Sequence, residues 1–337
     1  MLGIGIIGGG RVSRAHGNAA EALAHTRLVG IAEVDPERRA TSTAQYGCRG
    51  YASAEEMLAD DSVEAVVVAL PHWLHADVAV AALRAGRHVL IEKPMAMNVE
   101  ECDRILAAAR ESGRTLMIGH SQHFFPINRE AVRRIAAGDI GEPVFATDTW
   151  YKPFWEGQRP PWFLDDTKGG GMWSMNGSHM LDRLQLFLQR SVVSVNAAVG
   201  NRIFGLSTDF GVAFVRFEGG LAATIQHVGY KDGVNRFEAE ITGTQAQLRI
   251  NGDRSGCNPL EISRNGSWEA LPVAPLELEL KSGASDPPGA FAAQMQDFAL
   301  AVREGRPPSV TGDWGRSVVA VLEACVQSSC DGGEVRL

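Results

Sequence analysis

A lysine stands where a buried strand is expected to end. The apolar run 89–91 is followed directly by Glu92, Lys93 and Pro94. Charged residues at the carboxyl end of a parallel strand lie where open α/β sheets bind their ligands. Proline restricts the backbone there and can support a cis peptide bond. The pattern leaves two interpretations open: Lys93 is a catalytic lysine, or it is an ordinary lysine at a strand end.

A second reactive candidate is His179, which the sequence places at the start of a helix. Asn176, Asp182 and Arg183 lie at offsets of three and four residues from it, and such offsets share one helical face. Histidine titrates near neutral pH, so His179 can take a hydroxyl proton while Asp182 orients the imidazole or binds a substrate hydroxyl. A histidine on a helix is by itself more often structural than catalytic, so this pattern alone does not decide between the two.

A glycine-rich turn follows the first apolar run and opens a helix. Gly8 permits a tight turn, and Gly10 lets backbone N–H groups approach a pyrophosphate at the helix N-terminus. Ser13 replaces the third glycine of the dinucleotide fingerprint and is still small enough for close helix–strand packing. The turn alone is a weak signal, because such glycines are common. The expected cofactor contacts here are Gly8, Gly10, Arg11 and Val12.

Glu33 strengthens the cofactor interpretation. It ends the second expected strand, at about the spacing from the glycine turn where an acid binds the adenosine ribose hydroxyls. An acid repels a 2′-phosphate and no arginine follows it directly, so NAD is expected in preference to NADP. Arg38 is a weaker signal in the opposite direction and is itself an expected cofactor contact. Asp35 is expected to cap the helix that begins at Pro36.

The first 121 residues alternate short apolar runs with helical patterns. Several runs are continuously apolar or, as at 63–70, apolar except for one residue (Glu64), which is typical of a parallel sheet covered by helices on both faces. This is the pattern of a doubly wound α/β domain. The sequence therefore predicts a dinucleotide-binding Rossmann domain at residues 1–121.

The alternation of strand-like and helical segments ends in residues 122–337, which are predicted to form an α+β domain. Strand-like runs fill 192–250, and Gly219-Gly220 indicates a hairpin between two of them. Several runs alternate apolar and polar residues, so one face of a large, open, mostly antiparallel sheet is expected to meet water or a partner. Helices are expected at 290–304 and 314–328.

Composition excludes several classes of function. The net charge of −8 argues against nucleic-acid binding, and no apolar stretch approaches the roughly 20 residues of a membrane span. The first strand begins at Leu2, which leaves no room for a signal peptide. Five scattered cysteines indicate buried thiols in a reduced, cytoplasmic setting, and no spacing of ligating residues indicates a metal.

Taken together, these residues resemble the Gfo/Idh/MocA oxidoreductases, a family named for glucose–fructose oxidoreductase, inositol dehydrogenase and a rhizopine-catabolism protein. The order and spacing of the landmarks agree from one end of the chain to the other. The matching segments are Gly8-X-Gly10, 69–75, 85–89, 92–94, 138–141, 169–171, 179–182, 297–298 and 305–308.

The resemblance implies roles for the candidates above. It implies a cis bond before Pro94, with Lys93 donating to the reacting oxygen, and His179 acting as the base opposite. Leu70, His75 and Glu92 would lie with Lys93 near the nicotinamide. The resemblance also implies that the open sheet forms a homodimer or homotetramer. The expected activity is hydride transfer between NAD(P) and a secondary alcohol or ketone of a sugar, polyol or cyclic diol.

Two departures from the family pattern fall where substrate is held. Many polyol-oxidising relatives carry an Asp one turn before the histidine, where this chain has Met175; Asn176 beside it is the candidate replacement. Relatives often carry an Arg-Phe pair where this chain has His123-Phe124. The expected substrate contacts are Lys93, His120, His123, Trp162, Met175, Asn176, His179 and Asp182.

Aromatic residues concentrate just before the second glycine run. Trp150, Trp155, Trp162 and Trp173 form either an aromatic wall for a ring-shaped substrate or a loop anchored in the core.

Two alternative functions share the cofactor. One is an NAD-dependent glycoside-cleaving enzyme with transient oxidation, and the other is a non-catalytic dinucleotide-binding sensor, which would need neither Lys93 nor His179.

Overall fold

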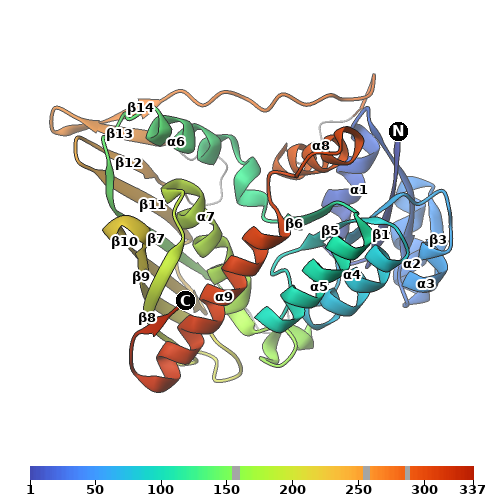
Figure 1. Cartoon of the computed structure of the whole chain (residues 1–337), viewed down its shortest axis with the longest axis horizontal. Coiled ribbons are helices and arrows are strands. Elements are labelled where there is room, and N and C mark those ends of the chain that lie inside the picture. The colour runs from blue at the N-terminus through green and yellow to red at the C-terminus, as the bar shows by residue number, and fades with distance from the viewer. Residues whose placement is uncertain (154–159, 253–258, 285–288) are drawn as a thin grey trace. The chain divides into compact units, whose positions relative to one another are not determined.

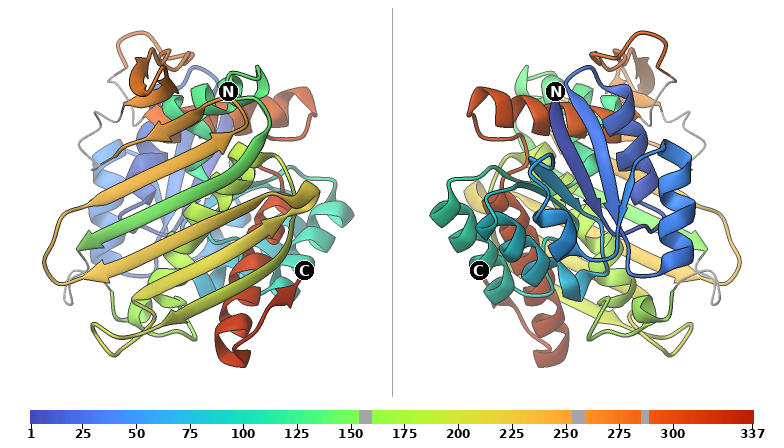
Figure 2. Two further views of the ribbon diagram at one scale, coloured as in Figure 1. Left: turned by 90° about the vertical axis from the view of Figure 1, so that its left-hand side faces the viewer. Right: turned by 90° about the vertical axis from the view of Figure 1, so that its right-hand side faces the viewer.

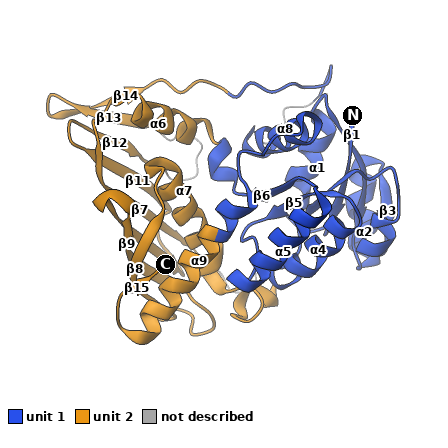
Figure 3. Cartoon of the chain, viewed as in Figure 1, with its two compact units in different colours: residues 1–124, 276–316 blue, residues 125–275, 317–337 orange. Residues whose placement is uncertain are grey.

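The computed structural model describes residues 1–153, 160–252, 259–284 and 289–337. Within it the chain forms two compact units, coloured separately in Figure 3. Unit 1 contains Met1–Phe124 and Leu276–Arg316, and unit 2 contains Phe125–Pro275 and Ser317–Leu337. The units are therefore not two halves of the sequence, because a late segment packs with the N-terminal one. Trp155 and Cys257 lie outside the described residues.

Unit 1 is built on a six-stranded parallel sheet with the order β3-β2-β1-β4-β5-β6. This order is that of the Rossmann fold, in which the strand order reverses beside β1 and places a ligand site at the carboxyl edge there. The expected fold of this part of the chain is confirmed (Figure 1). The strands are β1 Leu2–Ile7, β2 Thr26–Ala32, β3 Arg49–Tyr51, β4 Ala65–Val68, β5 His88–Glu92 and β6 Leu116–Gly119.

The helices between residues 13 and 112 connect successive strands of this sheet. Asp35, Ser53 and Asn98 cap three of them with side-chain oxygens that accept N–H groups of the first turn. A late helix, α8, packs on α1. The helical segments are α1 Ser13–Ala22, α2 Pro36–Tyr46, α3 Ala54–Leu58, η1 His72–Leu74, α4 His75–Arg84, α5 Val99–Ser112, η2 Ser121–Phe124 and α8 Gly289–Glu304.

The strand expected at 63–70 is shorter in the structure. Only Ala65–Val68 pairs with its neighbours, although Val63 is fully buried as well. The apolar run thus marks burial rather than strand length, and Pro71 leads into η1 directly after it. The short strand delivers Leu70 and His75 to the same edge of the sheet as the end of β5.

Unit 2 is built on a nine-stranded sheet with the order β14-β13-β12-β11-β7-β10-β9-β8-β15. Its pairs are antiparallel except for β7 with β10, so the predicted mostly antiparallel sheet is confirmed. Gly219 and Gly220 have φ of 77° and 81° and turn β9 into β10, as expected for a hairpin. The strands are β7 Pro143–Pro153, β8 Val192–Gly200, β9 Phe210–Phe217, β10 Ala222–Tyr230, β11 Arg236–Gly243, β12 Gln247–Ile250, β13 Leu260–Arg264, β14 Ser267–Leu271 and β15 Val335–Arg336.

Helices cover one face of this sheet, and Figure 2 (left) shows the other face, on which no described helix lies. α7 packs on β7 and β10. The alternating burial of β10, with Ala223, Ile225 and His227 facing the helices, follows from this arrangement. The helical segments are α6 Pro126–Ala136, η3 Pro161–Leu164, the π-helix η4 Trp173–Gly177, α7 Ser178–Leu188, η5 Glu218–Gly220 and α9 Gly312–Asp331, whose first residues belong to unit 1.

Candidate active site

The glycine turn after β1 is crowded at Gly8 and open at Gly10. Gly8 has φ of 108°, and a Cβ there would come within 2.4 Å of the Ala69 carbonyl oxygen, so only glycine fits. The space beside Gly10 is open, with no atom within 4 Å of a Cβ built there. No side chain caps the N-terminus of α1, unlike those of α2, α3 and α5. Its first N–H groups can therefore hold an anion.

Glu33 is buried just after β2, and its carboxylate binds the backbone of the glycine turn. Its Oε2 accepts the Gly9 N–H at 3.0 Å, and its Oε1 accepts the N–H of Asp35 at 3.0 Å. Arg38 Nη2 lies 3.2 Å from the same Oε1, so the arginine is paired with the acid. Asp35 caps α2, as expected, by accepting from Glu37 and Arg38.

Lys93 follows β5 directly and is joined to Pro94 by a cis peptide bond, as the resemblance implied. Glu92 anchors this point of the chain, because its Oε2 accepts the Lys93 N–H at 3.2 Å and its Oε1 accepts from His16 Nε2 at 2.8 Å. Burial opposes ionisation of Glu92, but the hydrogen bond from His16 and the nearby charge of Lys93 lower its pKa overall. A buried carboxylate therefore lies at the base of the lysine.

His75 connects the end of the β4 segment to the cis turn. Its Nδ1 lies 2.9 Å from the Pro94 carbonyl oxygen, and its Nε2 lies 2.9 Å from that of Leu70. Burial lowers the pKa of His75, against the two carbonyl contacts that raise it. A neutral imidazole donates from one nitrogen only, so one contact is a hydrogen bond and the other is a close approach.

In unit 2, the start of α7 lies along the central strand β7 with matched side chains. Arg183 binds Asp148 with two hydrogen bonds of 2.7 Å, and the His179 ring stacks on Trp150 with centroids 5.3 Å apart and planes at 21°. Offsets of three and four on a helix, and of two on a strand, each share one face. His179 therefore stands on a fixed aromatic support.

The same row continues at Asn176, in the π-helix that precedes α7. Lys152 Nζ donates to Asn176 Oδ1 at 2.8 Å, and Asn176 Nδ2 lies 2.8 Å from His227 Nε2. All three side chains are at most 2% exposed. Burial, with the charge of Lys152, lowers the pKa of His227 to about 3, so His227 is neutral and accepts this hydrogen bond.

The remaining predicted substrate residues lie in both units. In unit 1, His120 is buried after β6, and the His123 ring packs edge-on against Trp314 with centroids 5.0 Å apart. In unit 2, Asp182 is buried in α7. Trp162 and Met175 pack on an apolar cluster formed by the buried Phe163 and Met172, together with Leu164 and Phe204.

The described tryptophans of the aromatic stretch lie in the core of unit 2 or pack against a buried cluster of it. Trp150 and Trp173 are buried and belong to the core, whereas Trp162 is half-buried. Four residues that hold candidate site side chains within their own units were not foreseen: His16 in unit 1, and Asp148, Lys152 and His227 in unit 2. The signal for two of them was available, because Asp148 and Lys152 are charged residues at inward-facing alternate positions of β7.

Other features expected from composition can be placed in the structure. The described cysteines are all free thiols; Cys102 and Cys325 are buried, but Cys330 is exposed and Cys48 half-buried, so the expectation of buried thiols was wrong for these two. Within the described ranges no three ligating residues could hold a metal ion. None of the helices in those ranges has both the length and the apolar character of a membrane span.

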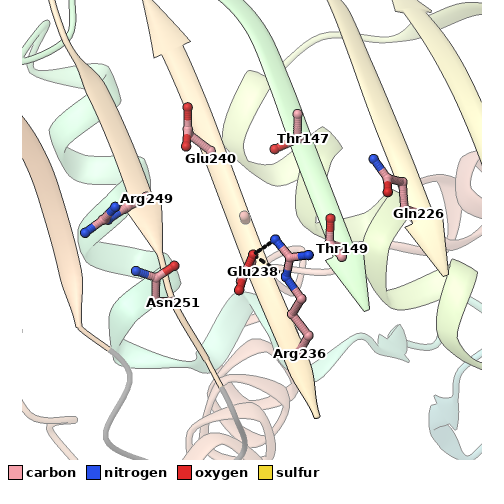
Figure 4. Close-up of a pocket in the computed structure, with 9 residues that line it drawn as sticks. Thr147, Thr149, Gln226, Arg236, Glu238, Glu240, Arg249 and Asn251 are labelled. Carbon is pink, nitrogen blue, oxygen red and sulfur yellow. Dashed lines mark hydrogen bonds and ion pairs between the residues drawn. The ribbon is translucent and has the colours of Figure 1, made fainter. Parts of the chain in front are cut away.

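A polar cavity of about 280 Å³ lies on the helix-free face of the nine-stranded sheet (Figure 4). Arg236 and Glu238 form an ion pair in it at 2.6 Å. The lining comes from four adjacent strands: Thr147, Thr149, Gln226, Arg236, Glu238, Ala239, Glu240, Arg249 and Asn251.

The Rossmann order, the uncapped helix after a glycine turn and the buried acid after β2 are the features of a dinucleotide-binding domain. Residues 2–120 match the family model described as the oxidoreductase family, NAD-binding Rossmann fold, and residues 132–337 match the model of its C-terminal alpha/beta domain. The chain belongs to the Gfo/Idh/MocA oxidoreductase family.

Three comparisons illustrate the range of the relatives. A 1-carboxy-3-chloro-3,4-dihydroxycyclohexa-1,5-diene dehydrogenase of Comamonas testosteroni is 32% identical over 66% of this chain, and the match spans 58% of that relative. A 1,5-anhydro-D-fructose reductase of Ensifer adhaerens is 27% identical over 97% of this chain and 96% of its own length. The crystal structure of aldose-aldose oxidoreductase from Caulobacter crescentus, complexed with glycerol, has a TM-score of 0.88 at 26% identity and covers 100% of this chain and 99% of that chain.

Proposed function

We propose that this protein oxidises a secondary alcohol of a sugar, polyol or cyclic diol with NAD, or reduces the corresponding ketone. The observation that carries the proposal is the anchoring of Lys93. Glu92 accepts the backbone N–H of Lys93 and is itself held by His16, so the lysine leaves the strand from a fixed point. Its ammonium group can then donate to the reacting oxygen.

The proposed reaction assigns one role to each of two residues. Lys93 donates a hydrogen bond to the alcohol oxygen and stabilises negative charge that develops on it. His179 accepts the hydroxyl proton, and the stacked Trp150 holds its ring in one orientation. The nicotinamide, when bound, supplies the hydride acceptor.

We propose NAD rather than NADP as the cofactor. The carboxylate of Glu33 follows β2, where it would meet the adenosine ribose, and a 2′-phosphate there would be repelled. Arg38 is paired with this acid at 3.2 Å, which removes the main argument for NADP. The proposed cofactor contacts are Gly8, Gly10, Arg11, Val12, Glu33, Arg38, Leu70, His75, Glu92 and Lys93.

Within the substrate range, a ring diol is the form we favour. Met175 replaces the Asp of polyol-oxidising relatives and packs with Trp162 on an apolar cluster, which suits a partly apolar ring better than a fully hydroxylated sugar. The relative that oxidises a dihydroxycyclohexadiene is consistent with this choice. The proposed substrate contacts are Lys93, His120, His123, Trp162, Met175, His179 and Asp182.

A panel of aldoses, inositols and cyclic diols assayed with NAD tests the proposal by NADH absorbance at 340 nm. Lys93→Met should abolish turnover with one of these substrates while NADH binding persists, and Lys281→Met, at a lysine that donates to the backbone of Glu21, serves as the matched control. Product release from glycosides without net NADH would instead support the glycoside-cleaving alternative. NADH binding without any turnover would support the sensor.

We propose that the open sheet face joins copies of this chain into a homodimer or homotetramer in the cytoplasm. The charged residues Arg236, Glu238 and Glu240, at every second position of β11 on this face, can pair with opposite charges of a second copy across a two-fold axis (Figure 4). The free thiols of the described cysteines are compatible with a reducing compartment. Sedimentation of the wild type and of Glu240→Arg tests the interface, because a reversed charge should dissociate the assembly.

A further inference from the structure

Three pairs of side chains connect the start of α7 to strand β7 in register. Asn176, His179 and Arg183 on the helical side meet Lys152, Trp150 and Asp148 on the strand. His179 occupies the middle position, between a buried hydrogen bond and a buried ion pair. The position of its ring therefore depends on the contacts on either side of it.

The hydrogen bond to Asn176 can form in one way only. The Lys152 ammonium has donors and no acceptor, so it must face Oδ1 of the amide, at 2.8 Å. The amide N–H groups are then directed to His227 Nε2, also at 2.8 Å. His227 must accept at Nε2 and hence carries its proton on Nδ1. A flipped amide would place donor against donor at Lys152.

His227 is suited to accept the hydrogen bond from Asn176 because its ring stays uncharged near neutral pH. Burial, with the charge of Lys152, lowers its pKa to about 3, so the ring stays neutral around pH 7. Lys152 and His227 come from β7 and β10, adjacent strands in the middle of the sheet. Asn176 is thus bound from two strands at once.

The segment that receives this anchor is a π-helix, Trp173–Gly177, which leads directly into α7. Single π-turns are rare, occur inside α-helices and are frequent at functional sites. A residue added or lost in such a turn would rotate the helix that follows. The side-chain anchor at Asn176 lies one residue before Gly177, where the π-helix ends, and three residues before His179.

We propose that Lys152, Asn176 and His227 form a positioning element that fixes the start of α7 and so the orientation of His179. The proposal rests on the proposed function, in which His179 is the base. It assigns Asn176 to the support of His179 and not to replacing the Asp that stands at Met175 in relatives.

Two variants of His227 separate positioning from mere folding. His227→Gln and His227→Leu are similar in size, but only glutamine keeps an oxygen that accepts from Asn176 Nδ2. His227→Leu should lower kcat about 10- to 100-fold per folded molecule, with the KM for NAD unchanged, as expected when a reacting group is displaced. His227→Gln should stay close to the wild type. Equal kcat in the two variants would overturn the proposal.

A second readout does not depend on activity. In ¹⁵N-histidine spectra at pH 7, the resonance that disappears in His227→Gln identifies His227, and it should be that of a neutral ring protonated at Nδ1. The His179 resonance should shift in His227→Leu but not in His227→Gln. A charged or Nε2-protonated His227, or an unmoved His179, would contradict the positioning element. Absence of turnover in the wild type would contradict the proposed function alone, because these spectra still decide the positioning.

Discussion

Arg183 and Asp148 form a two-point ion pair inside unit 2, with Nε to Oδ2 and Nη2 to Oδ1 both at 2.7 Å. The aspartate is fully buried and the arginine side chain is 5% exposed. Burial raises the pKa of Asp148 to about 6, against the opposing charge of Arg183. The guanidinium also lies over the Trp150 ring at 5.5 Å, and Trp150 in turn supports His179. This ion pair therefore belongs to the support of the proposed base.

Removing one member of this pair should be more harmful than removing both. Asp148→Asn or Arg183→Met leaves a buried group without its partner and should cost about 3–5 kcal/mol of unfolding free energy. The double variant Asp148→Leu with Arg183→Met should cost less than either single change. Urea unfolding of the four proteins measures this. Single variants that lose under about 1 kcal/mol would show that the pair is replaceable by water.

The contact between Glu92 and His16 gives a second prediction, located in unit 1. Glu92→Leu removes the acceptor for both the Lys93 N–H and His16 Nε2 and should cost about 1–3 kcal/mol, the penalty for buried groups left without a partner. Glu92→Gln keeps an oxygen and the shape, so it should cost less in stability. Both variants should lower kcat, because Lys93 loses its charged anchor. Chemical denaturation combined with NADH-linked assays distinguishes the two effects, and a Glu92→Leu protein of wild-type stability would contradict the account.

The fold was predictable from the sequence because its signals are local. Continuous apolar runs such as 89–91 mark the buried parallel strands, and the hairpin at Gly219-Gly220 follows from the freedom of glycine at positive φ. The short strands β13, β14 and β15 were not predicted. Their five, five and two residues mix polar and apolar side chains, and pairing with a neighbouring strand determines them more than their own pattern does.

The reactive residues of the candidate site could be predicted from the sequence, but the buried residues that hold them in place could not. Lys93 and His179 follow recognisable motifs, whereas Lys152 and His227 are separated by 75 residues and meet only through Asn176. Such contacts arise from the parallel pairing of β7 with β10, which is a long-range property. The π-helix before α7 gives no sequence signal that distinguishes it from an α-helix.

Cofactor preference gives a third prediction, in which a substitution of the nearby Asp35 is the control. Glu33→Ser removes the carboxylate and leaves Arg38 only its longer contact of 3.9 Å with Asp35, so the ratio of kcat/KM for NAD over NADP should fall about tenfold or more, as for the loss of one charged hydrogen bond. Asp35→Ala removes a helix cap and should cost about 1 kcal/mol without changing the ratio. Steady-state kinetics with both cofactors measures the two ratios. If the variants behave alike, Glu33 does not select the cofactor.

The pH dependence of stability gives the fourth prediction, and its sign follows from His227. Its pKa is about 3 in the folded protein and 6.5 as a free side chain, so the unfolded chain binds the proton first as the pH falls. The stability that His227 contributes is complete above pH 6.5 and is lost progressively between pH 6.5 and about 3, at up to about 1.4 kcal/mol per pH unit.

Asp148 acts with the opposite sign in an overlapping window. Its pKa is raised from 3.8 to about 6 on folding, so its contribution is complete below pH 3.8 and is lost as the pH rises through 6. A titration of the wild type alone would mix the two effects. The difference between wild type and His227→Gln removes the Asp148 contribution, because both proteins share it. From pH 7 to pH 4 the urea midpoint of the wild type should fall relative to that of His227→Gln, and parallel curves would mean that His227 is protonated in the folded protein as readily as in the unfolded chain.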